Sequence, residues 1–377
     1  MSNARQTGTT SGATYVPPGM PELEQDGAVT SFFEFWPLWV MYLPVALLWL
    51  VLAVRYRSLT LPLIANPAVP LSGMVGVPKS RILSVAGARG RQWILPWTVY
   101  TVTDLDVESQ LATVRQLWAS AGLALPLVAK PDIGCRGAGV KLLQTELQLR
   151  ACLQAYPESA RIQFQQLSDF EAEAGVFYVR HPDAPSGAIT SLTLKYTPFV
   201  VGDGNSTLAQ LVAQDPRAGQ LQHLYAQRHA ARWQEVIPAG QPYRLVFSAS
   251  HCRGAVFRDG AEYIDQRLTA TLDRIFADIP EFYYGRLDIK FRDLDSLMAG
   301  ENFDIIEING ASSESINIWD RRTGLGVAVR TLLQQYRTLF KLGSANRKRG
   351  HKPPGIKALW QAWRYEKNLT KSYPPND

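Results

Sequence analysis

Two stretches decide the fold of this 377-residue chain: GRLDIKF at residues 285–291 and FDIIEIN at residues 303–309. Polar and apolar residues alternate along both, which is the pattern of β-strands that place one face on a core. The connection includes LDSLMAGEN at 294–302, which suits a hairpin. The polar side chains expected to share one face of this hairpin are Arg286, Asp288, Lys290, Glu307 and Asn309.

Three oxygen-bearing side chains on that face form a candidate metal site. Pairing of the strands can bring together Asp288, Glu307 and Asn309, with Ile306 and Ile308 pointing inward. Alternate residues on a strand lie roughly 6.5–7 Å apart, so the group can serve a pair of cations. Two carboxylates and an amide oxygen are hard ligands that favour Mg²⁺ over zinc. The alternative is a half-exposed hairpin whose polar face is solvated.

A lysine followed by a glycine-rich turn lies upstream, in VAKPDIGCRGAGV at 128–140. Lys130 is expected on a strand that begins at Leu127, and the glycines from Gly134 to Gly139 leave backbone amides accessible. An ammonium group beside such amides is suited to binding phosphate. The stretch contains neither a Walker motif nor a dinucleotide fingerprint. An ordinary surface hairpin is the alternative.

Residues 35–54 read FWPLWVMYLPVALLWLVLAV, a run without a charge. Its length is about that needed to cross a hydrocarbon layer of ~30 Å. Segment 32–57 is therefore predicted to be a single transmembrane helix, with a buried globular helix and a cleaved signal peptide as alternatives. Acidic residues precede it, and Arg55 and Arg57 follow it, which predicts a C-terminal body in the cytoplasm and, in a bacterium, an inner-membrane location.

Positive charge is concentrated in the tail at 341–377, where nine basic residues face two acidic ones, so this tail accounts for the net charge of +6. Apolar residues recur there at helical spacing. This predicts an amphipathic helix that lies on anionic lipid or packs on the body. The residues at that spacing are Ile356, Leu359, Trp360 and Trp363. The body lacks a basic face with interleaved aromatics, so no nucleic-acid partner is expected. The three scattered cysteines indicate neither a disulfide scaffold nor a zinc ribbon.

The remaining pattern predicts an α+β body. Helices are expected at 107–121, 142–155 and 207–213, the last capped by Ser206, and strands at 161–167 and 174–179. The predicted parts are a disordered N-terminus at 1–31, the transmembrane segment at 32–57, a short N-terminal lobe or linker at 58–125, a main domain at 126–340 and the basic tail at 341–377. Within the lobe or linker, residues 58–100 have no clear assignment.

Together, the lysine strand, the glycine loop and the hairpin resemble the ATP-grasp superfamily, and most closely its D-alanine–D-alanine ligase-like carboxylate–amine ligases. The resemblance covers about residues 126–336 and includes VVGDGNST at 200–207, which is similar to a turn in cyanophycin synthetase. It implies an ATP-grasp fold, in which two α+β lobes hold the nucleotide between them. The residues it implies for nucleotide binding are Lys130, Gly134, Arg136, Gly137, Gly139, Gln165, Gln166, Glu173 and Lys195.

The resemblance also implies individual roles. Lys130 and Lys195 would bind the phosphates of ATP, and the glycine loop would close over them. Gln165 and Gln166 would line the hinge against adenine, and Glu173 would hold the ribose. The remaining roles concern catalysis and metal binding: Lys130 and Arg286 as catalytic residues, and Asp288, Glu307 and Asn309 as ligands of two Mg²⁺ ions, with Mn²⁺ as a substitute.

The implied reaction joins a small-molecule carboxylate to an amine through an acyl phosphate at the cytoplasmic face of a membrane. The alternatives are an ATP-grasp phosphotransferase and a non-catalytic, membrane-bound nucleotide sensor. The stretch GASSESINIWD at 310–320 lacks the Ser-Pro-Gly turn of the D-alanine ligases, so neither substrate is indicated. His251 and Arg253 are interpreted either as neighbours of the substrate or, for His251, as a structural histidine. The oligomeric state has no signature in the sequence.

Overall fold

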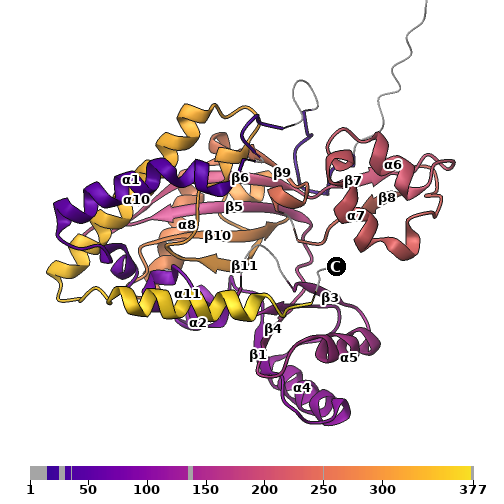
Figure 1. The fold of residues 1–377 in the computed structure, drawn as a ribbon, viewed down its shortest axis with the longest axis horizontal. Coiled ribbons are helices and arrows are strands. Elements are labelled where there is room, and N and C mark those ends of the chain that lie inside the picture. Colours follow the sequence, from indigo (N-terminus) through magenta and orange to yellow (C-terminus); the bar gives the residue numbers. More distant parts are fainter. Residues whose placement is uncertain (1–14, 25–29, 35, 135–138, 249, 375–377) are drawn as a thin grey trace, which may run out of the picture.

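The computed structural model describes residues 15–24, 30–34, 36–134, 139–248 and 250–374. These residues form an α+β fold, as predicted, and the paired strands of its sheets are antiparallel. Figure 1 shows three parts: a central five-stranded sheet flanked by long helices, a four-stranded sheet with two helices, and a small part with a two-stranded sheet.

The central sheet has the strand order β11-β10-β5-β6-β9. Its strands are β5 (Ala172–Val179), β6 (Ala188–Tyr196), β9 (Val256–Asp259), β10 (Tyr284–Phe291) and β11 (Phe303–Asn309). The predicted hairpin is confirmed as β10 and β11, which are joined through the short helix α9 (Leu294–Met298). Leu287, Ile289 and Phe291 are buried on its inner face, as the alternation predicts.

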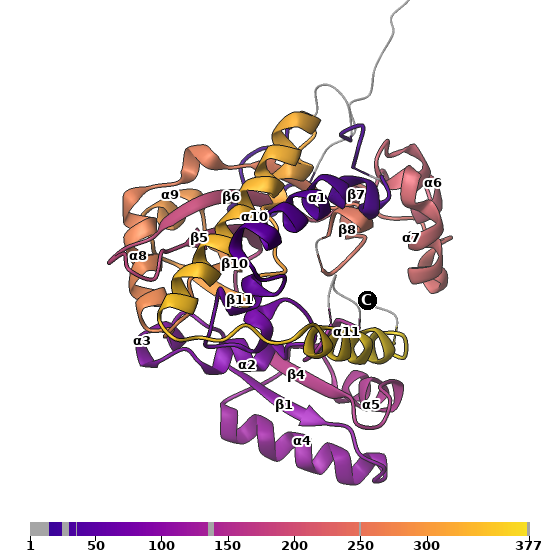
Figure 2. The ribbon, with the colours of Figure 1, turned by 60° about the vertical axis from the view of Figure 1, so that its left-hand side comes forward.

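Helices cover both faces of the central sheet. The face with Leu287 packs on α8 (Gln266–Ala277) and α2 (Lys79–Ser84) in the largest apolar core. The opposite face packs at one end on α10 (Leu325–Lys348). Helix α1 (Leu38–Tyr56) lies alongside α10, as both views show (Figures 1 and 2). The polar part of that face contacts the four-stranded sheet, since Lys130 donates to the carbonyl oxygen of Ile306. Phe257 of β9 instead packs in an apolar cluster with Ala328 and Leu332 of α10.

The four-stranded sheet has the order β1-β4-β2-β3, with β1 (Trp97–Thr101), β2 (Leu127–Pro131), β3 (Lys141–Leu143) and β4 (Arg161–Gln166). Its apolar face packs on α4 (Val107–Ala121) and α5 (Glu146–Ala155). Helix α4 has the predicted bounds. The helix predicted from residue 142 begins only at Glu146, because β3 pairs with β2 and Thr145 then forms a capping box with Gln148.

The small part contains β7 (Phe199–Val201), β8 (Pro242–Arg244), α6 (Leu208–Gln214) and α7 (Gln222–Arg228), and it has its own apolar core. The prediction that Ser206 caps α6 is wrong. The hydroxyl of Thr207 accepts the hydrogen bond from the backbone of Gln210, whereas Ser206 donates to Asp203 in the preceding turn.

The unassigned segment 58–100 is folded into the body and contributes α2, α3 (Ala88–Arg91) and part of β1. The described 3₁₀ turns are η1 (Leu61–Ile64), η2 (Pro70–Gly73), η3 (Ala218–Leu221), η4 (Ala230–Arg232), η5 (His251–Arg253), η6 (Ala261–Tyr263) and η7 (Ile316–Trp319). The predicted tail helix is present as α11 (Ile356–Thr370). Glu366 accepts a hydrogen bond from the backbone of Gly76, so α11 contacts the body.

Part of the N-terminal stretch expected to be disordered is ordered. Residues 1–14 and 25–29 lie outside the described residues, but residues 15–24 pack on the central core through Val16, Met20 and Leu23. The hydroxyl of Tyr196 donates to the carbonyl oxygen of Pro21 at 3.1 Å. Composition alone missed this because the anchoring partners lie far away in the sequence.

One helix among the described residues is long and apolar enough to span a membrane by length and composition: Trp39–Tyr56, with a mean hydropathy of 1.7. Only 17% of that window is buried in the protein. The buried-helix alternative therefore applies to one side of α1 only.

Candidate active site

A β-bulge shapes the hairpin at its carboxylates. Asp288 lies directly opposite Glu307, and the register shifts immediately after Asp288, so that Ile289 faces Ile305 and Ile306 is left without a partner in the ladder. The prediction that Ile306 points inward is wrong, because the bulge gives the inner position to Ile305. The carbonyl oxygen of Ile306 instead accepts a hydrogen bond from Lys130 at 2.9 Å.

Asp288 lies at the centre of a charged group on the polar face. Arg286 Nε donates to its Oδ1 at 2.9 Å, and Lys195 Nζ lies 3.4 Å from the same oxygen. Asn309 Nδ2 lies 3.4 Å from Oδ2. Burial alone would raise the pKa of Asp288, but Arg286 and Lys195 outweigh it, so its pKa is below the ordinary value. Asp288 is therefore a carboxylate at neutral pH.

Glu173 on β5 joins two lysines of the same face. Its carboxylate lies 2.6 Å from Lys195 Nζ and 3.0 Å from Lys290 Nζ, and its side chain is 7% exposed. Burial would raise the pKa of Glu173, but the two ammonium groups reverse the shift and lower the pKa to about 2. Burial would likewise lower the pKa of Lys195, but Asp288 and Glu173 together raise it.

Lys130 reaches this face from the other sheet. Leu127 and Ala129 pack toward α4 and α5, so the alternation of β2 turns Lys130 to the opposite side, toward the central sheet. Its Nζ donates to Gln165 Oε1 at 2.8 Å as well as to Ile306. Burial lowers the pKa of Lys130 to about 8, against an opposing effect of Glu307.

A fourth lysine, which the sequence patterns did not reveal, completes the cationic set. Lys79 begins α2, and its Nζ lies 3.5 Å from Glu307 and donates to the carbonyl oxygen of Gly134. Fully buried Asp132 holds this region together by accepting from Ser80 N at 2.8 Å and from Arg161 Nε at 2.8 Å. Lys79 lies in the unassigned segment, where no motif marked it.

The glycine loop starts beside these groups. Gly134 and Gly139 both have positive φ, 149° and 73°, and a Cβ on Gly139 would lie 2.8 Å from Pro131 Cγ. Gly139 therefore has a steric reason to be glycine. The predicted loop residues Arg136 and Gly137 lie outside the described residues.

Two buried amides on the same sheet as Lys130 have polar atoms that lack hydrogen-bond partners within the described part of the chain. Among the described residues, both side-chain polar atoms of Gln163, and Nε2 of Gln165, are buried without a partner. Ile162 and Phe164 fill the core on the other side of β4, so Gln163 and Gln165 face the central sheet. Unsatisfied buried amides are rare and point to a missing polar ligand. Gln163 was missed by the sequence analysis, although the alternation along β4 places it beside Gln165.

Gln166, the other predicted hinge residue, is placed differently. Its side chain bonds to backbone atoms of Ala124 and Pro126 at 3.3 Å and does not join the buried group. The remaining predicted residues come together from both sheets: Lys130 and Gln165 on one wall, and Glu173, Lys195, Arg286, Asp288, Glu307 and Asn309 on the other.

No protein-family model matches the chain, and no curated protein matches it by sequence. Several solved structures are similar to it at low identity. The bifunctional glutathione synthetase from Pasteurella multocida has 15% identity and a TM-score of 0.34, with 68% of this chain and 36% of that chain covered. The chain thus spans about a third of that synthetase.

Two further similar structures are ligases of D-alanine. The D-alanine–D-alanine ligase from Bacillus anthracis has 12% identity and a TM-score of 0.37, with 71% of each chain covered. The VanG D-Ala:D-Ser ligase from Enterococcus faecalis has 12% identity and a TM-score of 0.37, with 70% of this chain and 62% of that chain covered.

The two walls together carry an excess of positive charge. Among the described residues, this group has five cationic side chains, Lys79, Lys130, Lys195, Arg286 and Lys290, and three carboxylates, Glu173, Asp288 and Glu307. An excess of two positive charges in a largely buried group favours a polyanionic ligand.

The hairpin carboxylates also fit a divalent cation. Like charges directly opposite each other on paired strands repel, and a cation between Asp288 and Glu307 would relieve that repulsion. Among the described residues, no three His, Cys, Asp or Glu side chains form a metal cluster. Mg²⁺ commonly takes only one or two carboxylates and completes its shell with phosphate and water oxygens, so this donor set suits it when a polyphosphate is bound.

His251 belongs to a different environment. Its ring stacks on Trp319, with centroids 4.5 Å apart and planes 12° from parallel. This contact agrees with the structural alternative for His251.

Proposed function

We propose that this protein is an ATP- and Mg²⁺-dependent ATP-grasp ligase that joins a carboxylate to an amine. One observation carries the proposal: Asp288 and Glu307 lie opposite each other on paired strands, and Lys130 of the second sheet donates to the carbonyl oxygen of Ile306 in the adjacent bulge. Paired carboxylates and lysines contributed by separate elements suit the joint binding of a divalent ion and a polyphosphate.

ATP would lie between the two sheets. Lys130, Lys195 and Lys79 would exchange their present carboxylate and carbonyl partners for phosphate oxygens, which make stronger charge-assisted bonds. The side-chain atoms of Gln163 and Nε2 of Gln165, which have no partner among the described residues, would supply hydrogen bonds from the four-stranded sheet. Glu173, held by two lysines, is the group we assign to the ribose.

Asp288, Glu307 and Asn309 would hold Mg²⁺. A bound Mg²⁺ supplies charge neutralisation on the phosphates. Arg286 is fixed by Asp288 and by the carbonyl oxygen of Glu314 at 3.2 Å, so its guanidinium is held in place to stabilise charge on the transferring phosphoryl group.

The reaction has two steps. A carboxylate oxygen of the first substrate attacks the γ-phosphorus of ATP, the bond to the bridging oxygen breaks, and ADP leaves with that electron pair. The nitrogen of the amine then attacks the acyl carbon, inorganic phosphate leaves, and the amine loses a proton to solvent. The protein positions the reactants and keeps water from the acyl phosphate, which requires no protein nucleophile.

We place this reaction at the cytoplasmic surface of a membrane, because α1 exposes more apolar surface than a solvated helix normally carries. The single-pass crossing is a prediction from the length of the apolar run, and its orientation is a prediction from the flanking charges. An in-plane arrangement of α1 competes with both.

The test is release of ADP and phosphate from ATP, with and without Mg²⁺, in the presence of pooled small-molecule carboxylates and amines. We expect turnover that requires both Mg²⁺ and substrates, and a loss of at least about 100-fold in Asp288→Asn and Glu307→Gln, as is usual when groups that stabilise transferring charge are removed. Glu301→Gln is the matched control, since Glu301 is exposed in the connection between the same strands.

The outcomes separate the alternatives. Amide formation with stoichiometric ADP and phosphate supports the ligase. A phosphorylated product without phosphate release supports a phosphotransferase. Tight ATP binding without turnover above the variants supports a sensor, and turnover unchanged in both variants would remove the basis for the proposal.

A further inference from the structure

Helix α1 has two different sides. Met41, Val45 and Leu52 are buried on the side toward the body. The opposite side exposes an apolar stripe at helical spacing, including Val54, which is 80% exposed. The members of this stripe are Trp39, Leu43, Leu47, Leu50, Val51 and Val54. A contiguous exposed stripe of this kind marks an interaction surface.

The neighbouring helix supplies charge of one sign. Helices α1 and α10 run side by side in the same direction (Figure 2). Trp49 of α1 contacts Phe340 of α10, and later in both helices the carbonyl oxygen of Tyr56 accepts a hydrogen bond from Arg347. Neither helix contains Asp or Glu. Four of the five exposed basic residues of α10 fall on one side of that helix, at Arg330, Arg337, Lys341 and Lys348, and the fifth, Arg347, donates to the backbone of α1. The apolar stripe is therefore bordered by positive charge.

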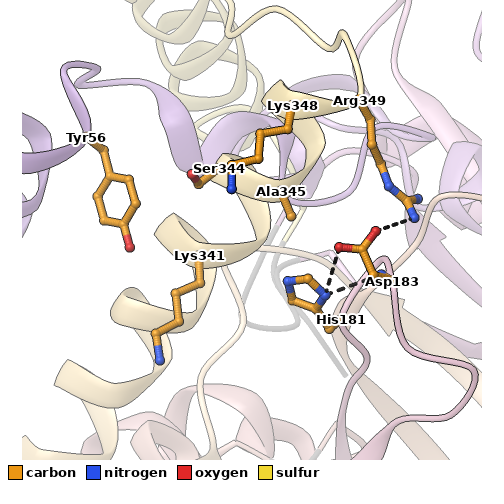
Figure 3. A pocket seen from close by; sticks show the side chains of 8 residues that line it. All are labelled: Tyr56, His181, Asp183, Lys341, Ser344, Ala345, Lys348 and Arg349. Atoms are coloured by element: carbon orange, nitrogen blue, oxygen red, sulfur yellow. Dashed lines mark hydrogen bonds and ion pairs between the residues drawn. The ribbon is translucent and has the colours of Figure 1, made fainter.

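A hollow of about 320 Å³ lies where α1 ends against α10. Figure 3 shows Tyr56, Lys341 and Lys348 on one side of it and the bonded group of His181, Asp183 and Arg349 on the other. Asp183 accepts from Arg349 at 2.8 Å and so is already neutralised. Within the described part of the chain, Lys341 and Lys348 have no carboxylate within ion-pair distance. Two such ammonium groups beside a hydroxyl suit a phosphate group.

Both ends of α1 are tied to the same body. Just before the helix, the buried Glu34 forms an ion pair with Arg217 of the small part, and Phe33 packs on Trp319. Just after it, Asn346 of α10 donates to the carbonyl oxygen of Ile64 at 2.8 Å. A helix that crossed a bilayer would carry its first flank to the far side and lose the Glu34–Arg217 pair. The contacts instead keep both flanks on one side.

We propose that the α1–α10 face binds the surface of an anionic bilayer. Helix α1 lies in the plane of the interface with its apolar stripe among the upper acyl chains, the basic residues of α10 contact headgroups, and the hollow at Tyr56 receives a lipid phosphate. This inference rests on the membrane location proposed above but not on the ligase reaction. The occupant is a lipid bilayer because an apolar stripe bordered by charge of one sign complements the amphipathic, negatively charged surface of such a bilayer.

The first experiment measures partition of the full chain onto vesicles by flotation. We expect binding to phosphatidylcholine vesicles that contain phosphatidylglycerol, and weak binding to phosphatidylcholine alone. Leu47→Glu should abolish binding. Lys341→Gln with Lys348→Gln should weaken it roughly 25-fold, since each basic residue near an anionic surface contributes about a fivefold factor. Arg89→Glu, on the exposed side of α3, is the control and should bind as wild type.

The second experiment measures topology in sealed inside-out vesicles of the expressing cell, with an epitope at each end of the chain. In-plane binding leaves both epitopes accessible to protease from outside the vesicle. Protection of the N-terminal epitope alone would establish a crossing helix and overturn the proposal. Equal binding to neutral and anionic vesicles would also overturn the proposal. So would a dimer that forms without lipid and is abolished by Leu47→Glu, because the partner of the apolar stripe would then be a second copy of the chain. If the wild-type protein binds anionic vesicles but shows no ATP turnover with any substrate pool, the result counts against the proposed ligase reaction and not against the membrane surface.

Discussion

Replacing Glu173 by glutamine tests the charged group at the heart of the site. The carboxylate of Glu173 is shared by Lys195 at 2.6 Å and Lys290 at 3.0 Å, and its side chain is 7% exposed. Glutamine keeps the shape of the side chain but removes the charge. Lys195 retains Asp288 at 3.4 Å, whereas Lys290 has no second carboxylate within ion-pair distance among the described residues.

The magnitude follows from the pKa. Glu173 titrates at about 2 in the folded protein, against an ordinary value of 4.5, which corresponds to about 3 kcal/mol of stability at neutral pH. Removing one partner of a buried pair typically costs about 3–5 kcal/mol. The two lysines respond differently: burial lowers the pKa of Lys290 despite Glu173, whereas the pKa of Lys195 is raised. Lys290 can therefore lose its proton in the variant, so we expect the lower figure, about 3 kcal/mol.

The sign of the pH dependence is fixed by the direction of the shift. A carboxyl group whose pKa is lowered by folding stabilises the protein above its unfolded pKa and loses that effect as the pH falls. The stabilisation from Glu173 is complete above about pH 5, and less than half remains at pH 3. The difference in stability between wild type and Glu173→Gln should shrink accordingly.

The assay is urea unfolding followed by circular dichroism at pH 7 and pH 3, in the same detergent for all variants. The control is Glu146→Gln, because Glu146 pairs with Arg115 on the exposed surface and its loss should leave the unfolding midpoint unchanged. A difference below about 1 kcal/mol for Glu173→Gln at pH 7, or a difference of equal size at both pH values, would refute the reasoning.

Three further predictions concern the lysine strand and its loop. Burial lowers the pKa of Lys130 to about 8, so calorimetry should show that ATP binding weakens from pH 7 to pH 9 and that protons are taken up on binding. The variant Lys130→Arg should lose this pH dependence. Equal ATP affinity of the wild type at both pH values would contradict the prediction. Gly139→Ala should lower the free energy of unfolding by about 1–3 kcal/mol more than the control Gly240→Ala. Gly240 has a similar φ of 75°, but a Cβ added there would have no atom within 4 Å among the described residues. Equal losses in urea unfolding would show that the contact with Pro131 is unimportant. Asp132→Asn should cost about 2–4 kcal/mol in the same assay, because the buried carboxylate accepts from Ser80 and Arg161, and an unchanged unfolding midpoint would be inconsistent with that role.

Much of the central architecture follows from local patterns. The alternation in 285–291 and 303–309 predicted the hairpin, its polar face and its inner residues Leu287 and Ile289, because side chains on a strand alternate between its two faces. The length of the apolar run predicted α1, and the spacing of apolar residues predicted α4 and α11. These are properties of neighbouring residues, which a sequence states directly.

Other features depended on distant partners. Alternation alone placed Ile306 inward, and the bulge that moves it, with its bond to Lys130, is visible only when the two sheets meet. The region before β1 had no readable pattern, yet it supplies Lys79 to Glu307. Strand β3 read as the start of a helix because three residues carry too little periodicity to oppose the helix that follows.

The sequence by itself determined which side chains share a face and that one helix is apolar enough to meet a membrane. Only the tertiary structure decided which faces meet: Lys130 with the bulge of β11, Glu173 with two lysines, and both ends of α1 with one body. The physical reason is that periodicity along a strand or helix fixes the direction of a side chain relative to its own element. The partner of that side chain depends on packing between elements that are far apart in the chain, and no local spacing encodes it.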